Sequence, residues 1–228
     1  LVLCGAHGDC SCECGCRRTV MIEKHDLYEA CVQSPPEMTL MLRAIHGDQP
    51  RILGEDFAGT AALSRHWVAN VSEGTAVAVD LDEGELGRAG KTPGVRTIVA
   101  DVREISDPVD CLFVGNFSIG YLHTRDELMG YLRHARKRIN AGGVFVCDTY
   151  GGESAYHLGS VDRDVALPGG LRCVYRWEQR EADPLTAMVA PSGMAAAHSA
   201  TSHSFVFIRR TSPLRGSVST WASRRFPI

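Results

Sequence analysis

The 228-residue chain has no long apolar segment, because no stretch approaches the about eighteen apolar residues that a membrane-spanning helix needs. It also has no excess of basic charge: 24 Lys and Arg residues stand against 27 Asp and Glu residues, for a formal net charge of −3. A protein that binds nucleic acid through its phosphates needs clustered basic residues. The composition therefore argues against insertion into a membrane and against a nucleic-acid partner.

A secretory signal pattern is also missing, since the first residues contain no charged region followed by a continuous apolar run. Five of the nine cysteines crowd residues 4–16, and the other four stand alone among apolar neighbours. Isolated cysteines of this kind are typical of reduced thiols, so we expect a cytoplasmic protein. The alternating cysteines of residues 10–16 could bind zinc or copper, but alternate side chains of a strand diverge and no histidine follows at zinc-finger spacing. We predict no metal site.

Residues 21–183 alternate short β-rich apolar runs with amphipathic helical patterns. This predicts one α/β domain, a doubly wound, mostly parallel sheet with helices on both faces. Two helices, at residues 25–33 and 36–46, precede the first strand and could form a lid. The expected strands are residues 51–55, 76–80, 95–100, 111–115 and 144–148, and the expected crossover helices are residues 59–69, 82–89 and 125–140.

The helix at residues 125–140 has the clearest local signals. Thr124 precedes Glu127 by three residues, which is the spacing of a capping box. Apolar residues then recur on one face, which should lie on the sheet. They are Leu128, Tyr131, Leu132, Ala135 and Ile139.

Both ends of the chain differ from this middle. No Asp, Glu or Lys occurs in residues 184–228, and no helical or strand period persists there. A disordered low-complexity tail is one interpretation. Translation of a shifted reading frame beyond about residue 189 is the other, which we favour, and residues 1–20 raise the same question. We therefore expect the C-terminal antiparallel strands to be incomplete after a late strand at residues 171–180.

An acidic turn follows the first expected strand. Glu55 and Asp56 end that strand, Gly59 lies in the turn, and Asp80 ends the next strand about 20 residues later. Ligands of open α/β sheets bind at the carboxyl ends of the strands, where an acid at this spacing can hold ribose hydroxyls. The pattern predicts a nucleotide site.

The charge of this turn discriminates between nucleotides. A dinucleotide brings a pyrophosphate to the first turn and needs a glycine-rich loop there, whereas this turn has one glycine, Phe57 and two carboxylates. Those carboxylates would repel a pyrophosphate, but they suit S-adenosylmethionine, which carries a sulfonium and an ammonium group.

In these features residues 26–183 resemble the class I S-adenosylmethionine-dependent methyltransferases, whose first turn follows an acid-x-Gly-x-Gly pattern. By position Glu55 is similar to the motif acid and Gly59 to the later glycine, while Phe57 replaces the usual earlier glycine. The resemblance implies S-adenosyl-L-methionine as the cofactor, held at four successive strand ends. The residues that it implies are Glu55, Phe57, Ala58, Gly59, Asp80, Leu81, Asp101, Val102, Asn116 and Phe117.

The resemblance also implies a role for the residues after each later strand. Asp80 matches the family's ribose-binding acid. Asp101 is similar to the residue that binds the adenine amino group, and Val102 would flank the ring. Asn116 and Phe117 occupy the motif that lines the methionine part of the cofactor and faces the acceptor.

Methyl transfer from a sulfonium needs mainly alignment and exclusion of water, because the electrophile is already activated. A base is required only where an acceptor such as a hydroxyl must lose its proton. Tyr121, His123 and Tyr150 are the candidates for that role, with Asp148 nearby in the sequence. The predicted function is methyl transfer to an unidentified small molecule.

Alternatives remain open at this point. A nicotinamide-dependent oxidoreductase would use a similar sheet, although G-x-G-x-x-G is missing, and a cofactor-binding protein without turnover would suit an incomplete sheet. Asp80 could merely cap the helix after it, and Asn116 could merely form hydrogen bonds with backbone groups of its turn. Tyr28 and Glu29 could either close over the cofactor or pack on the sheet.

Overall fold

The computed structural model describes residues 2–3, 20–21, 23–150, 158–167, 171–179, 203–209 and 222–224. Side chains are described for residues 23–150, 158–167 and 171–179. The cysteines of residues 4–16 and most of the C-terminal tail lie outside the described residues, so the predictions made for them stay predictions.

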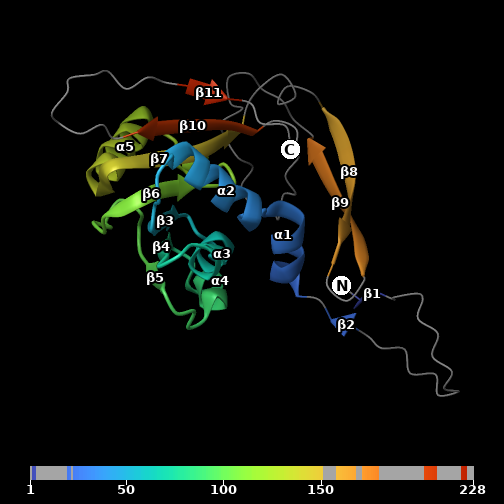
Figure 1. The fold of residues 1–228 in the computed structure, drawn as a ribbon. Helices are drawn as coiled ribbons and strands as arrows, with labels where there is room; N and C mark the ends of the chain where they lie inside the picture. Colours follow the sequence, from blue (N-terminus) through green and yellow to red (C-terminus); the bar gives the residue numbers. More distant parts are fainter. Residues whose placement is uncertain are drawn as a thin grey trace, which may run out of the picture.

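A seven-stranded sheet forms the centre of the structure (Figure 1). Its five parallel strands run in the order β5-β4-β3-β6-β7, so the chain moves outward from β3 to β5 and returns to β6. The strand order therefore switches between β3 and β6, and the predicted doubly wound α/β class is confirmed. The strands are β3 (Ile52–Asp56), β4 (Thr75–Asp80), β5 (Val95–Val99), β6 (Val109–Val114) and β7 (Ile139–Tyr150).

The sheet continues beyond β7 with two strands from the C-terminal part of the chain. β10 (His203–Arg209) pairs antiparallel with β7, and β11 (Ala222–Arg224) pairs antiparallel with β10. The sequence pattern predicted no strand at residues 203–209, but β10 pairs with β7 along its whole length. The antiparallel edge is short, since β11 has only three residues.

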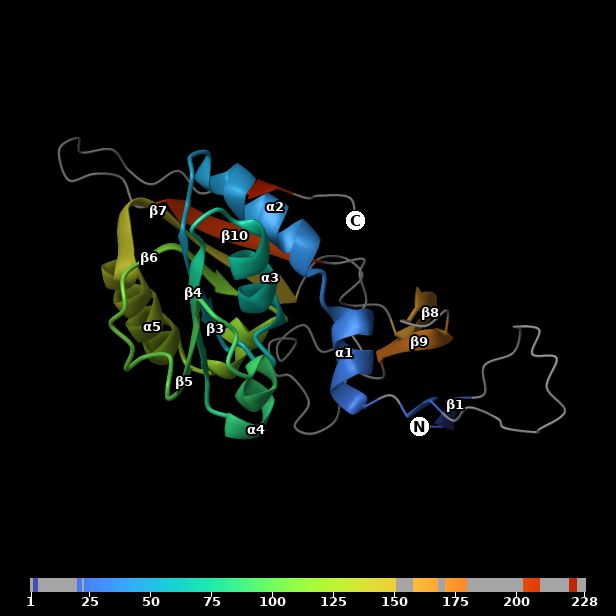
Figure 2. The same ribbon diagram turned by 60° about the horizontal axis from the view of Figure 1, so that its bottom comes forward.

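Helices cover both faces of the sheet, as predicted (Figure 2). α2 and α3 pack on one face, where Leu42 and Trp67 meet strand residues such as Val146. α5 packs on the other face through Tyr131 and Ala135. No described helix is long and apolar enough to cross a membrane. The helices are α1 (Lys24–Val32), α2 (Pro35–His46), α3 (Ala62–Asn70), α4 (Glu83–Leu86) and α5 (Arg125–Arg138), with 3-10 turns η1 (Gly87–Ala89) and η2 (Ser118–Tyr121).

The predicted capping box of α5 is confirmed. The Thr124 hydroxyl accepts a hydrogen bond from the Glu127 amide at 3.2 Å, and the Glu127 carboxylate accepts one from the Thr124 amide at 3.0 Å. Tyr131 and Ala135 of the predicted apolar face are buried on α5, whereas Ile139, also buried, lies beyond the end of this helix and begins β7. The local sequence thus sets both the start of this helix and the side that it buries.

A separate antiparallel hairpin consists of β8 (Gly159–Ala166) and β9 (Arg172–Gln179). The strand predicted at residues 171–180 is confirmed as β9, although its partner is β8 and not the main sheet. α1 lies between the main sheet and this hairpin in both ribbon views (Figures 1 and 2). Near the N-terminus, β1 (Val2–Leu3) and β2 (Val20–Met21) form a further short pair.

Candidate functional site

The turn between β3 and α3 has an unusual backbone. Phe57 and Ala61 have φ angles of 58° and 54°, in the left-handed region that side chains with a Cβ seldom adopt. Phe57 thus takes a conformation typical of glycine at the position where the methyltransferase motif has glycine. The centroid of its ring lies 6.2 Å from that of Tyr121 and 6.3 Å from that of Tyr131. A Cβ added at Gly59 would meet no atom within 4 Å, so the turn is open there.

Glu55 ends β3 on the face of the sheet that α3 covers. Its carboxylate accepts hydrogen bonds from the Ser64 amide at 2.9 Å and from the Ser64 hydroxyl at 2.5 Å. Burial raises the pKa of Glu55 to about 7, against the opposing effect of the Ser64 hydrogen bonds. These donors are neutral, so the negative charge of the carboxylate has no hydrogen-bonded cation among the described residues.

Asp56 points to the opposite face, because successive side chains of a strand alternate. Both of its oxygens accept from the Arg138 guanidinium, at 2.9 and 2.8 Å, and Tyr131 donates a hydroxyl hydrogen bond at 2.8 Å. All three side chains are buried. The sequence pattern placed Glu55 and Asp56 together in one acidic turn, and that placement is wrong: Asp56 is neutralised beneath α5 and faces away from Glu55.

Asp80 connects the end of β4 to the turn after β3. One of its oxygens accepts from the Gly59 amide at 2.7 Å, and the other accepts from the Asp82 amide at 3.0 Å. The helix cap belongs to Asp82, whose side chain accepts from the Glu85 amide at 3.1 Å. Asp80 is therefore not the cap of α4, which removes that alternative. Leu81, beside it, is 71% exposed.

Thr60, next to Gly59, has a buried hydroxyl with no hydrogen-bond partner among the described residues. Buried polar atoms almost always have partners, so an orphaned hydroxyl at this turn is compatible with a ligand contact. Ala58 beside it is buried, and its amide donates to the Val79 carbonyl at 2.9 Å. The backbone of the turn is thus hydrogen-bonded to β4, and the Thr60 hydroxyl has no partner among the described residues.

After β5, Asp101 is engaged by its own neighbour. Arg103 donates to both carboxylate oxygens, at 2.9 and 2.5 Å, and these hydrogen bonds lower the pKa of Asp101. Val102 is buried in the core beneath α5, together with Val79. The roles of Asp101 and Val102 toward an adenine ring stay predictions.

The turn after β6 is held by a residue that the sequence pattern did not single out as a support. Asn116 and Phe117 both have left-handed backbones, with φ angles of 54° and 58°. Their amides donate to the two oxygens of Asp148, at 2.9 and 2.7 Å. Asp148 ends up buried, and burial raises its pKa to about 7 against the effect of the two amides. An acid within a buried strand was the signal that could have revealed this role.

The three candidate acid–base residues lie in different settings. Tyr121 is 65% exposed beside Phe57, and His123 is exposed at the start of α5. Tyr150 lies with its ring centroid 5.5 Å from that of Phe117, and its hydroxyl donates to Gln179 of the hairpin. The structure thus brings Tyr150, but not His123, into contact with a predicted cofactor-binding residue.

α1 lies over this edge of the sheet. Burial raises the pKa of Tyr28 to about 12, and the neighbouring acidic groups Tyr121 and Asp148 act in the same direction, so Tyr28 lies near η2 and the end of β7. Of the two helices predicted as a lid, α2 packs on the face of the sheet, and the lid role of α1 stays a prediction. Glu29 pairs with Arg65 of α3 at 2.6 Å and serves to attach α1.

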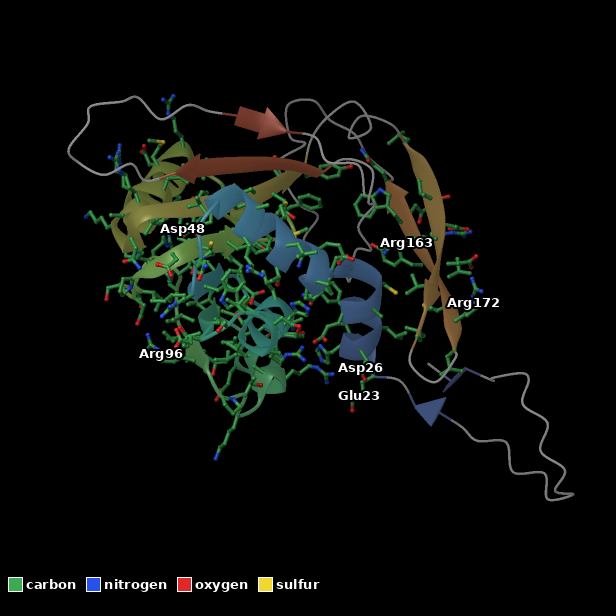
Figure 3. All side chains as sticks on the ribbon, viewed as in Figure 1. Glu23, Asp26, Asp48, Arg96, Arg163 and Arg172 are labelled. Carbon is green, nitrogen blue, oxygen red and sulfur yellow. The ribbon has the colours of Figure 1, made fainter. Side chains whose placement is uncertain are left out.

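Further ion pairs attach the start of α1 to the turn after β4. His25 lies 2.9 Å from Glu85, and Arg88 of η1 pairs with both Glu23 and Asp26. Glu23 and Asp26 are seen at the first turn of α1 in Figure 3. These exposed or half-exposed pairs each contribute little, so α1 is held by many weak contacts.

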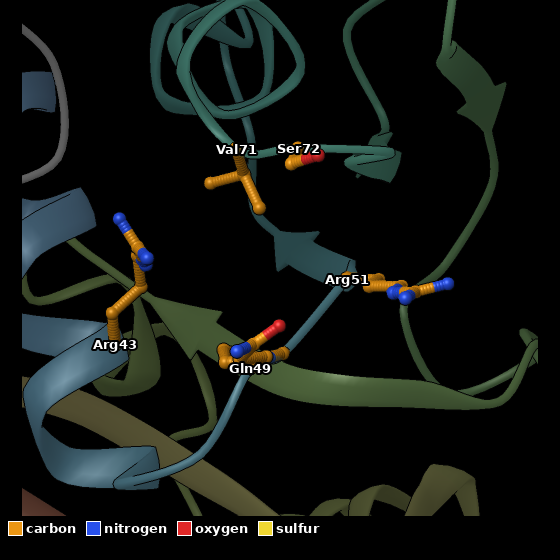
Figure 4. A pocket seen from close by; sticks show the side chains of 6 residues that line it. Arg43, Gln49, Arg51, Val71 and Ser72 are labelled. Atoms are coloured by element: carbon orange, nitrogen blue, oxygen red, sulfur yellow. The ribbon is translucent and has the colours of Figure 1, made fainter.

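A small hollow of about 70 Å³ lies at the opposite edge, where the strands begin (Figure 4). None of the predicted site residues borders it. Its lining consists of Arg43, Gln49, Pro50, Arg51, Val71 and Ser72. Among the described residues, no group of three or more His, Cys, Asp or Glu side chains could hold a metal ion.

Comparison with known proteins gives fold similarity alone. No family model matches the chain, and no curated protein sequence matches it. The sugar N-methyltransferase KedS8 from Streptoalloteichus has a TM-score of 0.56 at 17% identity, over 96% of this chain and 82% of that one. The amino pentose methyltransferase CalS10 from Micromonospora echinaspora has a TM-score of 0.55 at 14% identity, over 90% and 81%.

A third structure agrees with these two. An S-adenosylmethionine-dependent methyltransferase from Clostridium acetobutylicum has a TM-score of 0.53 at 16% identity, over 88% of this chain and 77% of that one. The chain therefore has the fold of the class I S-adenosylmethionine-dependent methyltransferases, as its resemblance to that family implied.

Proposed function

We propose that the protein binds S-adenosyl-L-methionine at the carboxyl ends of its parallel strands and transfers the methyl group to a small molecule. The observation that carries this proposal is the position of Asp80. It ends β4, where the ribose-binding acid is expected, and accepts a hydrogen bond from Gly59 in the turn that would hold the rest of the nucleoside. The Asp80 carboxylate thus connects the strand end that would hold the ribose with the turn that would hold the rest of the nucleoside.

The residues of this edge fit such a cofactor. Glu55 is a buried carboxylate with neutral hydrogen-bond donors, and the charge of Arg65 lowers its pKa while that of Asp80 raises it, so the two acids interact with each other. A cation such as an ammonium or sulfonium would relieve the repulsion between the two acids. The unpaired hydroxyl of Thr60 and the open space at Gly59 lie in the same turn. A pyrophosphate, by contrast, would meet the charge of Glu55, which disfavours the nicotinamide alternative.

The cofactor, when bound, supplies an activated methyl electrophile, so the protein's contribution is to bind, align and exclude water. Asp148 fixes the turn that carries Asn116 and Phe117. α1, with Tyr28, covers the same edge and would limit access of water. We assign Tyr150 to positioning, because its hydroxyl is engaged by Gln179, and leave Tyr121 and His123 as the groups that could receive a proton.

A small-molecule amine is the acceptor class that we propose to test first. KedS8 and CalS10 are described as a sugar N-methyltransferase and an amino pentose methyltransferase, and this chain shares their fold. A neutral amine needs no base before it attacks, and it loses its proton afterwards. Such an acceptor would therefore suit a site in which burial raises the pKa values of the Tyr28 and Tyr150 hydroxyls.

The first experiment is calorimetric titration of the purified chain with S-adenosylmethionine, S-adenosylhomocysteine and reduced nicotinamide dinucleotide. We expect micromolar binding of the first two ligands, and Asp80→Ala should weaken it at least about tenfold, which corresponds to about 1.4 kcal/mol. Asp82→Ala is the matched control, because Asp82 lies two residues away and caps α4. A folded protein that bound neither adenosyl ligand, or that preferred the nicotinamide, would contradict the proposal.

Turnover is tested separately with a panel of amino sugars and other small amines, using transfer of a labelled methyl group. Transfer to an amine that depends on Asp80 supports an enzyme. Tight cofactor binding without transfer to any acceptor class would favour the alternative of a binding protein without turnover.

A further inference from the structure

Two thiols from distant parts of the chain lie in van der Waals contact. Cys31 of α1 and Cys173 of β9 have their sulfur atoms 3.8 Å apart, although 142 residues separate them in the sequence. The other two cysteines with described side chains, Cys111 and Cys147, are buried on opposite faces of the main sheet. Only the first pair therefore joins two separate elements.

This thiol pair lies where α1 packs on the hairpin. Cys31 is buried in an apolar cluster with Val165 and Leu167, and Cys173 packs against the same cluster while staying partly exposed. The sulfur atoms are thus held close by packing that does not depend on a bond between them. A disulfide needs a separation of about 2.05 Å, so the side chains must move by a further short distance.

A cation lies beside the pair. Arg163 of β8 donates a hydrogen bond to the Cys31 carbonyl, and its guanidinium lies 5.3 Å from the ring centroid of Tyr175. Figure 3 shows Arg163 on the strand pair next to α1. Burial raises the pKa of Cys31 to about 11, and the charge of Arg163 opposes this rise. A positive charge near a thiol favours the reactive thiolate form.

We propose that Cys31 and Cys173 form an oxidisable dithiol, whose disulfide clamps α1 onto the β8–β9 hairpin and slows ligand exchange at the carboxyl edge of the sheet. The clamping part rests on the proposed function, because it concerns access to the cofactor site. Formation of the disulfide itself does not.

The oxidant is a small-molecule disulfide such as oxidised glutathione. Cys173, the more accessible thiol, loses its proton and attacks one sulfur, which forms a mixed disulfide and releases one small thiolate. The Cys31 thiolate then attacks the Cys173 sulfur and displaces the second small thiolate. The protein thus loses two protons and two electrons, and the oxidant is reduced to two thiols.

The effect on the site follows from the contacts of α1. Its other side carries Tyr28 toward Asp148 and is attached to α3 and η1 by ion pairs such as Glu29 with Arg65 and Arg88 with Asp26. α1 can therefore move away from the site when these weak ion pairs break. A covalent bond to the hairpin removes that freedom.

The disulfide is tested by incubating the full chain in buffers of increasing ratio of oxidised to reduced glutathione, followed by tryptic mass mapping without reduction. The expected product links the peptides of residues 25–43 and 173–176 and weighs two hydrogens less than their sum. Cys31→Ser and Cys173→Ser should each abolish it, Cys147→Ala should retain it, and Arg163→Gln should slow its formation. Absence of this linked pair from the oxidised wild-type chain would overturn the proposal.

The clamp is tested by the rate at which S-adenosylhomocysteine leaves the oxidised and the reduced chain, measured by stopped-flow displacement. Release should be at least about fivefold slower after oxidation, a coupling of ordinary size, and Cys173→Ser should show no such difference. Equal release rates from a fully linked chain would overturn the clamp. Linkage without binding of the ligand in either state would instead contradict the proposed function, and ligand binding without linkage would contradict this inference alone.

Discussion

The two faces of the sheet treat their acidic residues differently at the ends of the strands. On the α5 face, Asp56 is bound by the Arg138 guanidinium and by Tyr131. On the α3 face, Glu55 and Asp148 receive hydrogen bonds from Ser64 and from two backbone amides. The first carboxylate is compensated by a cation, whereas the other two are held by neutral donors.

The partner of each carboxylate bears on whether that carboxylate could also bind a ligand. A buried ion pair that is complete within the protein has no charge left for a ligand. The donors to Glu55 and Asp148 named above are neutral, and burial raises the pKa values of both carboxyl groups to about 7. In our proposal the cationic groups of the cofactor would lie on the α3 face, whereas Asp56 on the α5 face is paired within the protein.

The largest effect should come from breaking the pair on the α5 face. Arg138→Met leaves Asp56 buried without its cation, and we expect a loss of about 3–5 kcal/mol in the free energy of unfolding. Urea denaturation measures it. Arg133→Met on the exposed side of the same helix is the control and should change little. Equal stability of the two variants would show that the ion pair is not a structural requirement.

Asp148→Asn should have the next largest effect. An amide side chain can accept from only one of the two donors at Asn116 and Phe117, and an unsatisfied buried amide costs about 1–3 kcal/mol. Stability should fall by that amount and cofactor affinity should fall with it, because the turn loses its support. Asp126→Asn, at the exposed first turn of α5, serves as the comparison. Unchanged affinity in the Asp148 variant would separate this turn from the cofactor site.

The pH dependence should distinguish the two faces. Glu55 and Asp148 have pKa values of about 7 in the folded state, above their ordinary values, so the folded state keeps protons that the unfolded state loses. Stability should thus fall as pH rises from about 5 to 7, by up to about 1.4 kcal/mol per pH unit for each group. Affinity for S-adenosylmethionine should rise over the same range, because the carboxylates become charged. Glu55→Gln should remove the share of Glu55 from both trends and leave that of Asp148; trends of unchanged size in that variant would exclude Glu55 as a source.

The smallest effect is expected for Ser64→Ala. It removes the hydroxyl donor to Glu55 and leaves the backbone donor, so stability should decrease by about 1 kcal/mol. The pKa of Glu55 should rise further, since one stabilising hydrogen bond to the charged form is lost. The pH profile of cofactor binding should therefore move to higher pH, relative to the exposed control Ser72→Ala. A shift to lower pH would contradict the assigned role of Ser64.

Much of the fold was predictable because its signals are local. Continuous apolar runs marked all five parallel strands, and the capping box of Thr124 and Glu127 marked the start of α5. The late strand β9 was also found. Its pairing with β8 was not, and β10 was missed, because the partner of a strand depends on contacts between distant segments.

The candidate site was predictable only in part. Residues after each strand end could be assigned by order along the chain, because parallel strands bring their carboxyl ends to one edge. The support that Asp148 gives to Asn116 and Phe117 spans about thirty residues and has no local pattern. The contact of Cys31 with Cys173 spans 142 residues and likewise has no local pattern.

The sequence by itself determined the class of fold, the positions of its five parallel strands along the chain and the acidic residues at the strand ends, because these depend on periodicity and on residue type. Only the tertiary structure decided which of the two adjacent acids, Glu55 or Asp56, is paired with a cation. Glu55 and Asp56 are adjacent in the chain, but the pleat of β3 sends them to opposite faces. Glu55 accepts hydrogen bonds from Ser64, a neutral donor, whereas Asp56 is paired with Arg138 within the core.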